Sequence, residues 1–183
     1  MEVSHNYFYL LERDPRFDDV AMRVVVNWGA PRAWQQRFRD REVLEVLPRG
    51  YVKEFPGYLD FVLNYSELVE IIEHPAANRK WHRSLRAVAG IYLLTDQSTG
   101  RQYIGSAYGA EGVLGRWRAY AAQPHGGNRH LRELLEQDPN QHRSFQFTLL
   151  RTLDKSMSKN EVLEVETTYK RKLGSRAFGL NAN

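Results

Sequence analysis

Residues 90–105 have the sequence GIYLLTDQSTGRQYIG, and this stretch decides the fold of the second half of the chain. Its two ends, Gly90–Leu94 and Gln102–Gly105, are rich in aliphatic and aromatic residues that favour strands. Between them, residues 95–101 gather Asp, Ser, Thr and Gly, the residue types that form turns. The stretch therefore predicts a β-hairpin.

The residues that follow the hairpin predict helices and one more strand. Residues 113–122 have apolar side chains at helical spacing, and Asn128 can cap a further helix. Residues 145–149 alternate Phe and Leu with polar residues, which is typical of a strand. We therefore expect an α+β fold with a three-stranded antiparallel sheet flanked by helices.

The last helix is the best defined by the sequence. Ser158 and Glu161 have the spacing of a capping box, and Gly174 is placed to end the helix. Stepping 100° per residue puts Glu166 inside the apolar stripe of this helix, whereas Glu161 and Glu164 fall on the opposite side. A carboxylate on an apolar face is costly unless it is paired or binds a cation. Glu166 is therefore either a functional residue or half of a buried ion pair with an arginine, unless the helix phase is different.

The first 85 residues predict a separate small α+β region. Residues 22–28 and 43–47 favour strands, and Ser66 could cap a short helix that Pro75 ends. We place the domain boundary in residues 73–86 (EHPAANRKWHRSLR), so the domains are residues 1–85 and 86–183. The role of the first region stays open between target recognition, dimerisation and support of the second domain.

Composition excludes several classes of protein. The chain has 183 residues, 42% of them hydrophobic and 26% charged, which is ordinary for a globular protein. There is no Cys, which excludes disulfide scaffolds, Cys-ligated zinc and thiol nucleophiles. No apolar run is long enough to cross a membrane, and the start of the sequence does not resemble a signal peptide. We expect a cytoplasmic protein without a membrane partner.

Charge is distributed unevenly along the chain. The first 85 residues hold 12 Lys or Arg and 13 Asp or Glu, a net charge of −1, and the remaining residues hold 14 and 9, a net of +5. A local basic excess favours binding to nucleic acid, although an ordinary solvated surface has the same composition.

The motif Gly90-Ile91-Tyr92, followed by Tyr103-Ile104-Gly105, is accompanied by four further residues in a fixed order. These are an Arg on the next helix, a Tyr one turn later, a Glu on the last helix and an Asn near the end: Arg116, Tyr120, Glu166 and Asn181. The whole pattern resembles the GIY-YIG nuclease family, and it covers residues 86–183.

This resemblance implies a divalent-metal-dependent endonuclease that hydrolyses phosphodiester bonds, with homing, restriction or defence as its uses. One Mg²⁺ or Mn²⁺ per active site would be held by Glu166, because a carboxylate with water and phosphate oxygens suits these ions. Arg116 offers a planar set of donors for phosphate oxygens.

The remaining site residues are assigned through the same resemblance. Tyr92 is our choice for the general base, with Tyr103 as the second phenol of the hairpin; a phenolate needs a nearby cation, since a free Tyr has a pKa near 10. Tyr120 would bind phosphate or relay a proton, and Asn181 would hold the site together by hydrogen bonds. His125 has a suitable pKa for proton transfer.

The expected partner is DNA, which the protein would contact through basic side chains. When bound to DNA, the protein would be associated with the nucleoid. The alternative functions are a catalytically inactive nucleic-acid-binding module and an RNA-directed nuclease. A homodimer would serve double-strand cleavage. Trp117 and Tyr108 are aromatic candidates for stacking on a base. Phosphate contacts that do not depend on base sequence would come from Arg101, Arg118, Arg129, Arg132, Lys170, Arg171 and Lys172.

Overall fold

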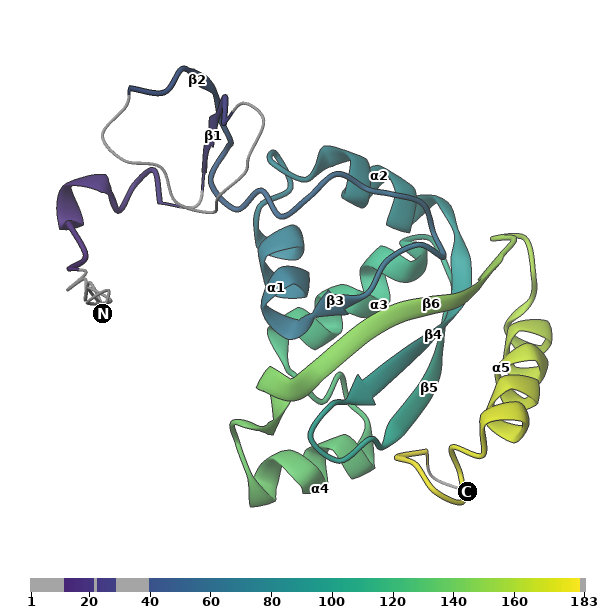
Figure 1. Ribbon diagram of the computed structural model, residues 1–183. Coiled ribbons are helices and arrows are strands. Elements are labelled where there is room, and N and C mark those ends of the chain that lie inside the picture. Colours follow the sequence, from purple (N-terminus) through teal and green to yellow (C-terminus); the bar gives the residue numbers. More distant parts are fainter. Residues whose placement is uncertain (1–11, 22, 29–39, 182–183) are drawn as a thin grey trace, which may run out of the picture. The chain divides into compact units, whose positions relative to one another are not determined.

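The computed structural model describes residues 12–21, 23–28 and 40–181 (Figure 1). The chain divides into two compact units, Met1–Arg49 and Gly50–Asn183. We describe each unit by itself.

The first unit contains a short 3₁₀ helix and a two-stranded sheet. The helix is η1 (Pro15–Phe17), which begins after Asp14, whose side chain accepts a hydrogen bond from the Arg16 amide. Strands β1 (Val24–Val26) and β2 (Val43–Val46) pair antiparallel. They lie within the two segments predicted to be strands, of which Met22 is outside the described residues.

The second unit is built around a four-stranded antiparallel sheet. Its strands are β3 (Leu63–Asn64), β4 (Ala89–Asp96), β5 (Gln102–Ala107) and β6 (Phe145–Leu153), in the order β3-β6-β4-β5. The predicted hairpin is β4 and β5, with Tyr92 opposite Gly105. The expected count of three strands was wrong by one, because β3 has only two residues, too few for any alternation to register in the sequence.

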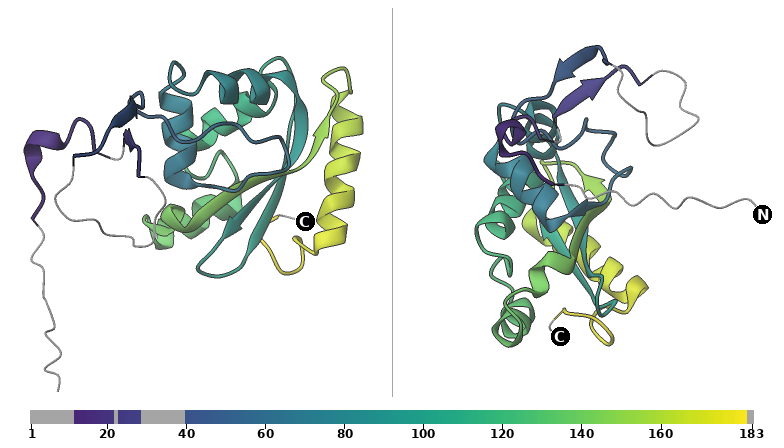
Figure 2. Two further views of the ribbon diagram at one scale, coloured as in Figure 1. Left: turned by 45° about the horizontal axis from the view of Figure 1, so that its top comes forward. Right: turned by 60° about the vertical axis from the view of Figure 1, so that its left-hand side comes forward.

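Helices cover both faces of this sheet (Figures 1 and 2). Along β4, Ala89 and Ile91 face α5 (Lys159–Leu173), where they pack with Val162. The alternate residues Tyr92 and Leu94 face the other side, where they join the larger core. That core is covered by α1 (Tyr65–Glu73), α2 (Arg79–Ala87) and α3 (Gly112–Ala122). The helix α4 (Arg129–Gln137) and the 3₁₀ helix η2 (Gln141–Ser144) lead into β6.

Helix caps follow the sequence with one exception. Ser158 and Glu161 form the predicted capping box of α5, and the Asn128 side chain caps α4 by accepting from the Leu131 amide. For α1 the predicted cap Ser66 was wrong, because Asn64 is the N-cap and forms a capping box with Glu67. As the N-cap, Asn64 accepts from the amide of Glu67, so the helix starts two residues earlier than a cap at Ser66 would place it.

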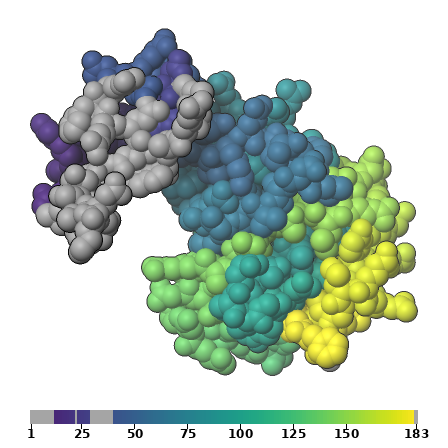
Figure 3. All heavy atoms as spheres, viewed as in Figure 1, coloured from purple at the N-terminus to yellow at the C-terminus, as the bar shows by residue number. Residues whose placement is uncertain are grey.

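The compact second unit begins at Gly50, whereas the sequence placed the boundary at residue 86. Phe61, Trp81 and Leu85 belong to the same core as Trp117, so α1 and α2 are part of the fold that carries the hairpin. Pro75 ends α1 as expected, but the turn that follows leads directly into α2. In the space-filling view, the blue surface of this early segment is continuous with the green and teal surface of the later elements (Figure 3).

No helix in the described parts of the chain is both long and apolar enough to cross a membrane.

Candidate functional site

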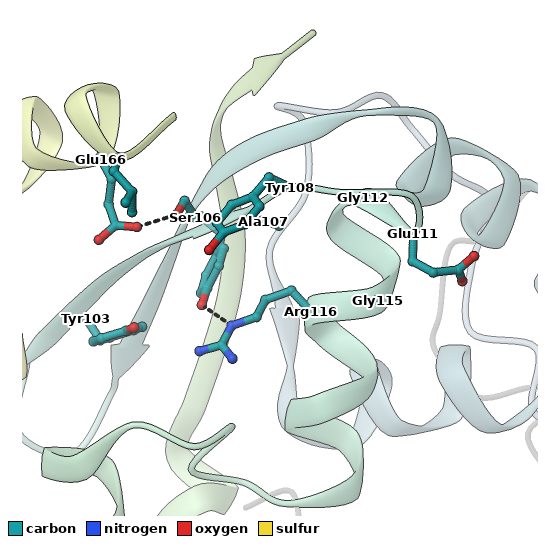
Figure 4. Close-up of a pocket in the computed structure, with 11 residues that line it drawn as sticks. Tyr103, Ser106, Ala107, Tyr108, Glu111, Gly112, Gly115, Arg116 and Glu166 are labelled. Atoms are coloured by element: carbon teal, nitrogen blue, oxygen red, sulfur yellow. Dashed lines mark hydrogen bonds between the residues drawn. The ribbon is translucent and has the colours of Figure 1, made fainter. Parts of the chain in front are cut away.

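A pocket lies across β5, an edge strand of the larger sheet, and takes side chains from both faces of that strand (Figure 4). Its volume is about 430 Å³, within the range of roughly 300–1,000 Å³ typical of small-ligand sites. Tyr103 and Arg116 line it on the α3 side, and Ser106 and Glu166 line it on the α5 side. Four of the predicted catalytic residues therefore meet here, namely Tyr92, Tyr103, Arg116 and Glu166.

Arg116 is held in place by three oxygen atoms. Its Nε donates to the Tyr92 hydroxyl at 2.9 Å and one Nη donates to the carbonyl of Gly126 at 2.8 Å. The other Nη lies 3.4 Å from the Tyr120 hydroxyl, and the guanidinium sits over the Tyr120 ring, 5.0 Å from its centroid. Arg116 and Tyr120, one turn apart on α3, are therefore in contact. A guanidinium has five N–H groups, so two remain for a phosphate in the pocket.

Tyr92 and Tyr120 are fully buried, and their hydroxyl oxygens are 3.1 Å apart. Burial raises the pKa of Tyr92 well above its usual value near 10, and the neighbouring phenols of Tyr120 and Tyr103 raise it further, although Arg116 opposes them. Burial also raises the pKa of Tyr120. The shift for Tyr92 is opposite to the one that a general base needs, so in this structure Tyr92 is a neutral phenol that orients Arg116.

Tyr103 differs from the other two tyrosines in exposure. It is half-buried and lines the pocket, and its hydroxyl has no hydrogen-bond partner among the described residues. Tyr108 also lines the pocket and is 42% exposed, whereas Trp117 is fully buried in the core. Of the two aromatic candidates for stacking on a base, only Tyr108 is therefore accessible.

Glu166 lies on the inner face of α5, as the helical phase predicted, and is 9% exposed. Its Oε2 accepts a hydrogen bond from the hydroxyl of Ser106, and its Oε1 forms an ion pair with Lys170 one turn later. Glu161 and Glu164 are exposed, as expected. The alternative of a buried ion pair is thus also realised, with a lysine from the same helix in place of an arginine.

Three predicted catalytic residues lie outside the pocket, namely Tyr120, Asn181 and His125. Tyr120 contacts Arg116 and Tyr92. Asn181 is buried and bonds twice to the backbone of Ile104, accepting from its amide at 2.9 Å and donating to its carbonyl at 2.7 Å. It therefore fastens the C-terminal segment to β5, beside Tyr103, as a structural residue. His125 does not line the pocket, and its Nδ1 accepts from the Gly127 amide at 2.9 Å, so it shapes the loop whose Gly126 carbonyl holds Arg116.

The predicted DNA-binding cations are only partly available. Lys170 is the least available of them, because its side chain is 15% exposed and its ammonium is paired with Glu166. Arg129 pairs with Glu133 at 2.8 Å, and Arg118 pairs with Glu111 at 2.6 Å. The other predicted cations form no ion pair with a described residue, and they are Arg101, Arg132, Arg171 and Lys172.

Sequence reasoning missed Ser106 and Lys170 as neighbours of Glu166. For Lys170 the signal was present, since Glu followed by Lys four residues later is a favourable pair on a helix. Ser106 stands two residues from Ile104 on the same face of β5, but nothing in the sequence indicated that this face meets α5.

No protein-family profile matches the chain, and no curated protein sequence matches it either. Among solved structures, two are similar. One is the catalytic domain of a point mutant of the intron endonuclease I-TevI, at 20% identity and a TM-score of 0.42, covering 52% of this chain and 94% of that one. The other is the catalytic domain of the homing endonuclease I-TevI, at 20% identity and a TM-score of 0.41, covering 52% of this chain and 98% of that one.

Proposed function

We propose that this chain is an endonuclease of the GIY-YIG type that uses a divalent metal ion to hydrolyse DNA phosphodiester bonds. The observation that carries the proposal is the meeting of Arg116, Tyr103 and Glu166 in one pocket, from three separate elements. This combination provides cationic donors for a phosphate, an accessible phenol and a carboxylate. Those groups match the needs of phosphodiester hydrolysis, which are charge stabilisation, orientation of water and protonation of the leaving group.

The oxygen atoms around Glu166 fit the implied metal ion. The Glu166 carboxylate lines the pocket with the Ser106 hydroxyl against it, and Mg²⁺ prefers such oxygen ligands. Within the described residues, no group of three His, Cys, Asp or Glu side chains gathers that could enclose a metal ion. Mg²⁺ or Mn²⁺ would therefore bind through Glu166 and keep water and substrate phosphate as its other ligands, and it would supply Lewis-acid chemistry when bound.

The roles of the protein groups follow from their contacts. Arg116, anchored by Tyr92 and the Gly126 carbonyl, binds the non-bridging oxygens of the scissile phosphate with its two remaining N–H groups. Tyr103 contacts the attacking water or the phosphate, because it lines the pocket and its hydroxyl has no partner among the residues that the structure describes. Tyr92 stays neutral and positions Arg116, and Tyr120 supports both.

The test is cleavage by the wild type, Glu166→Gln and Glu164→Gln with Mg²⁺ or Mn²⁺. The substrates are supercoiled, linear and single-stranded DNA and structured RNA. Glu164 lies on the same helix but is exposed, so it controls for charge and helix stability. We expect Glu166→Gln to reduce DNA cleavage by at least about a hundredfold, since the group that it removes acts directly on the transition state. Glu164→Gln should cleave at the wild-type rate.

Three results would overturn the proposal. The first is a wild type that cuts no nucleic acid, and salt-sensitive binding in that case would indicate the binding module. The second is Glu166→Gln that cuts as fast as the wild type. Cleavage of RNA alone would assign the site to RNA. If both DNA strands are cut, the expected partner is a second copy of the chain, because one active site cuts one strand. Sedimentation with DNA would detect this homodimer.

A further inference from the structure

The outer face of α2 is strongly basic. Trp81 and Leu85 are buried in the core, at 1% and 0% exposed, which turns the opposite side of the helix to solvent. Arg79, Arg83 and Arg86 lie on that side at helical spacing, and all three are exposed. Residues 74–95 contain four Lys or Arg and no Asp or Glu. The remaining cation of the helix, Lys80, is neutralised by Glu54 at 2.7 Å.

Two cations from other elements extend this face into a concave surface. Arg83 and Arg86 line a pocket of about 630 Å³ together with Arg118 of α3 and Lys155, which follows β6. The Lys155 ammonium donates to the carbonyls of Arg86 at 3.2 Å and Ala110 at 2.7 Å, which fixes its place beside the end of α2. We call Arg83, Arg86, Arg118 and Lys155 the basic surface.

Glu111 connects the basic surface to the candidate active site. Its carboxylate accepts from Arg86 at 3.0 Å and from Arg118 at 2.6 Å, so it orients both guanidinium groups. One carboxylate faces four cations, so the basic surface keeps a net positive charge. The same residue lines the pocket that contains Arg116 and Glu166. In the close-up, Glu111 lies at the end of that pocket opposite Glu166 (Figure 4). The basic surface therefore begins where the candidate active site ends.

We propose that the basic surface binds the DNA backbone beside the phosphate held by Arg116, and so sets the path of the substrate across α3 and α2. The inference rests on the proposed function, since it takes the bound DNA to be the substrate. Several Arg and Lys side chains on separate elements, without a base-reading motif, suit contacts to successive phosphates that do not depend on sequence. Each such contact releases a counterion, so binding weakens with salt in proportion to the number of phosphates contacted.

The test measures binding of the full chain to a labelled 30-base-pair DNA duplex by fluorescence anisotropy, without divalent metal, between about 50 and 200 mM salt. We compare wild type with Arg83→Gln/Arg86→Gln, and use Arg143→Gln/Arg176→Gln as the matched control. Both control arginines are exposed and line neither the candidate active site nor the basic surface. Thermal melting verifies that each variant is folded.

The slope of log Kd against log salt should fall by about two for Arg83→Gln/Arg86→Gln, with weaker binding at the lowest salt. The control should keep the wild-type slope, and Arg83→Lys/Arg86→Lys, which preserves charge, should keep most of it. An unchanged slope and affinity in the Gln variant would overturn the inference. A loss seen only with an RNA duplex would overturn the assignment to DNA.

Cleavage by the same proteins separates this inference from the proposed function. If the wild type cuts DNA and Arg83→Gln/Arg86→Gln binds and cuts equally well, the basic surface is not the substrate path although the nuclease stands. If the wild type cuts nothing but the Gln variant loses its salt-dependent binding, the basic surface is a DNA-binding site and the nuclease assignment fails.

Discussion

The hydroxyl of Tyr92 occupies the space beside residue 105 where any other residue would carry a side chain. A Cβ atom at Gly105 would lie 2.3 Å from that hydroxyl oxygen and 3.0 Å from the Tyr103 ring. These distances are well below van der Waals contact, and the obstruction is a ring packed in the core rather than a flexible chain end. Gly105 is therefore needed for close packing, which lets the Tyr92 hydroxyl reach Arg116.

Gly105→Ala should damage the site more than the fold. The new methyl group displaces the Tyr92 ring, and Arg116 loses the acceptor of its Nε. Overpacking of this kind costs about 1–3 kcal/mol, which a domain of this size can tolerate. We expect a lower unfolding midpoint in urea together with a loss of cleavage that exceeds the loss of folded protein. Wild-type values for both quantities would show that Tyr92 does not depend on the glycine.

Lys170 competes with any cation that binds Glu166. Its ammonium is paired with Oε1 of that carboxylate, and both side chains are largely buried. A divalent ion at Glu166 has to displace this ammonium, and it also experiences repulsion from a nearby like charge. Lys170 therefore holds the carboxylate in position at the expense of metal affinity.

Removing this charge should tighten metal binding. We expect Lys170→Met to lower the Kd for Mn²⁺, measured by calorimetry on the free protein, by about three- to tenfold. Lys172→Met is the matched control, because Lys172 is exposed on the same helix and forms no ion pair with a described residue. Weaker Mn²⁺ binding in Lys170→Met would mean that the ammonium acts only to orient Glu166.

The turn between β4 and β5 is organised by one buried carboxylate. Asp96 is 0% exposed and accepts from the hydroxyls of Ser98, Thr99 and Ser144 and from the amide of Gln141, at 2.6–2.8 Å. Burial raises the pKa of Asp96, but these hydrogen bonds outweigh it and lower the pKa to about 2. The carboxylate thus joins the hairpin turn to η2.

This shift predicts how stability depends on pH. Because the pKa of Asp96 is lower in the folded chain than in the unfolded chain, its contribution is present above about pH 4 and is lost as the pH falls towards 2. We expect about 1–2 kcal/mol from this group. Asp96→Asn should be less stable at neutral pH, and its free energy of unfolding should change less between pH 5 and 2.5 than that of the wild type. Asp138→Asn, at an exposed aspartate, should follow the wild-type curve.

The helices and strands that have a long repeating apolar pattern could be predicted from the sequence. The short or mostly polar elements could not. The hairpin, α3, β6 and α5 each repeat an apolar pattern long enough to recognise, and the helical phase placed Glu166 inward. β3 was missed because it has two residues. α2 was missed because only Trp81, Leu85 and Ala87 are apolar among nine residues.

The same distinction holds in the candidate site. Arg116 and Tyr120 lie one helical turn apart, so the sequence predicted their contact. The state of Tyr92 was not predictable, because its pKa depends on burial by side chains from α3. Short-range spacing is therefore informative, whereas the surroundings of a side chain depend on long-range packing.

The second unit relies on residues 50–85 for much of its core. Phe61 packs against Trp81, with ring centroids 4.8 Å apart, and against Trp117 of α3 at 5.9 Å. Tyr65 donates its hydroxyl to the carbonyl of Tyr120 at 3.3 Å, at the end of the helix that carries Arg116. The early segment thus packs against α3 and holds it in place.

Truncation distinguishes the boundary at Gly50 from the one at residue 86. Residues 86–183 alone would lose the burial of six large core side chains, namely Phe61, Leu63, Leu68, Ile71, Trp81 and Leu85. Each contributes about 1.5–3 kcal/mol, so together they match or exceed the 5–15 kcal/mol by which a domain is usually stable. We therefore expect residues 50–183 to give a cooperative thermal transition and a dispersed amide spectrum, and residues 86–183 to give neither. A folded 86–183 fragment would mean that the hairpin, α3, β6 and α5 form a sufficient core by themselves, and that α1 and α2 are an addition to that core.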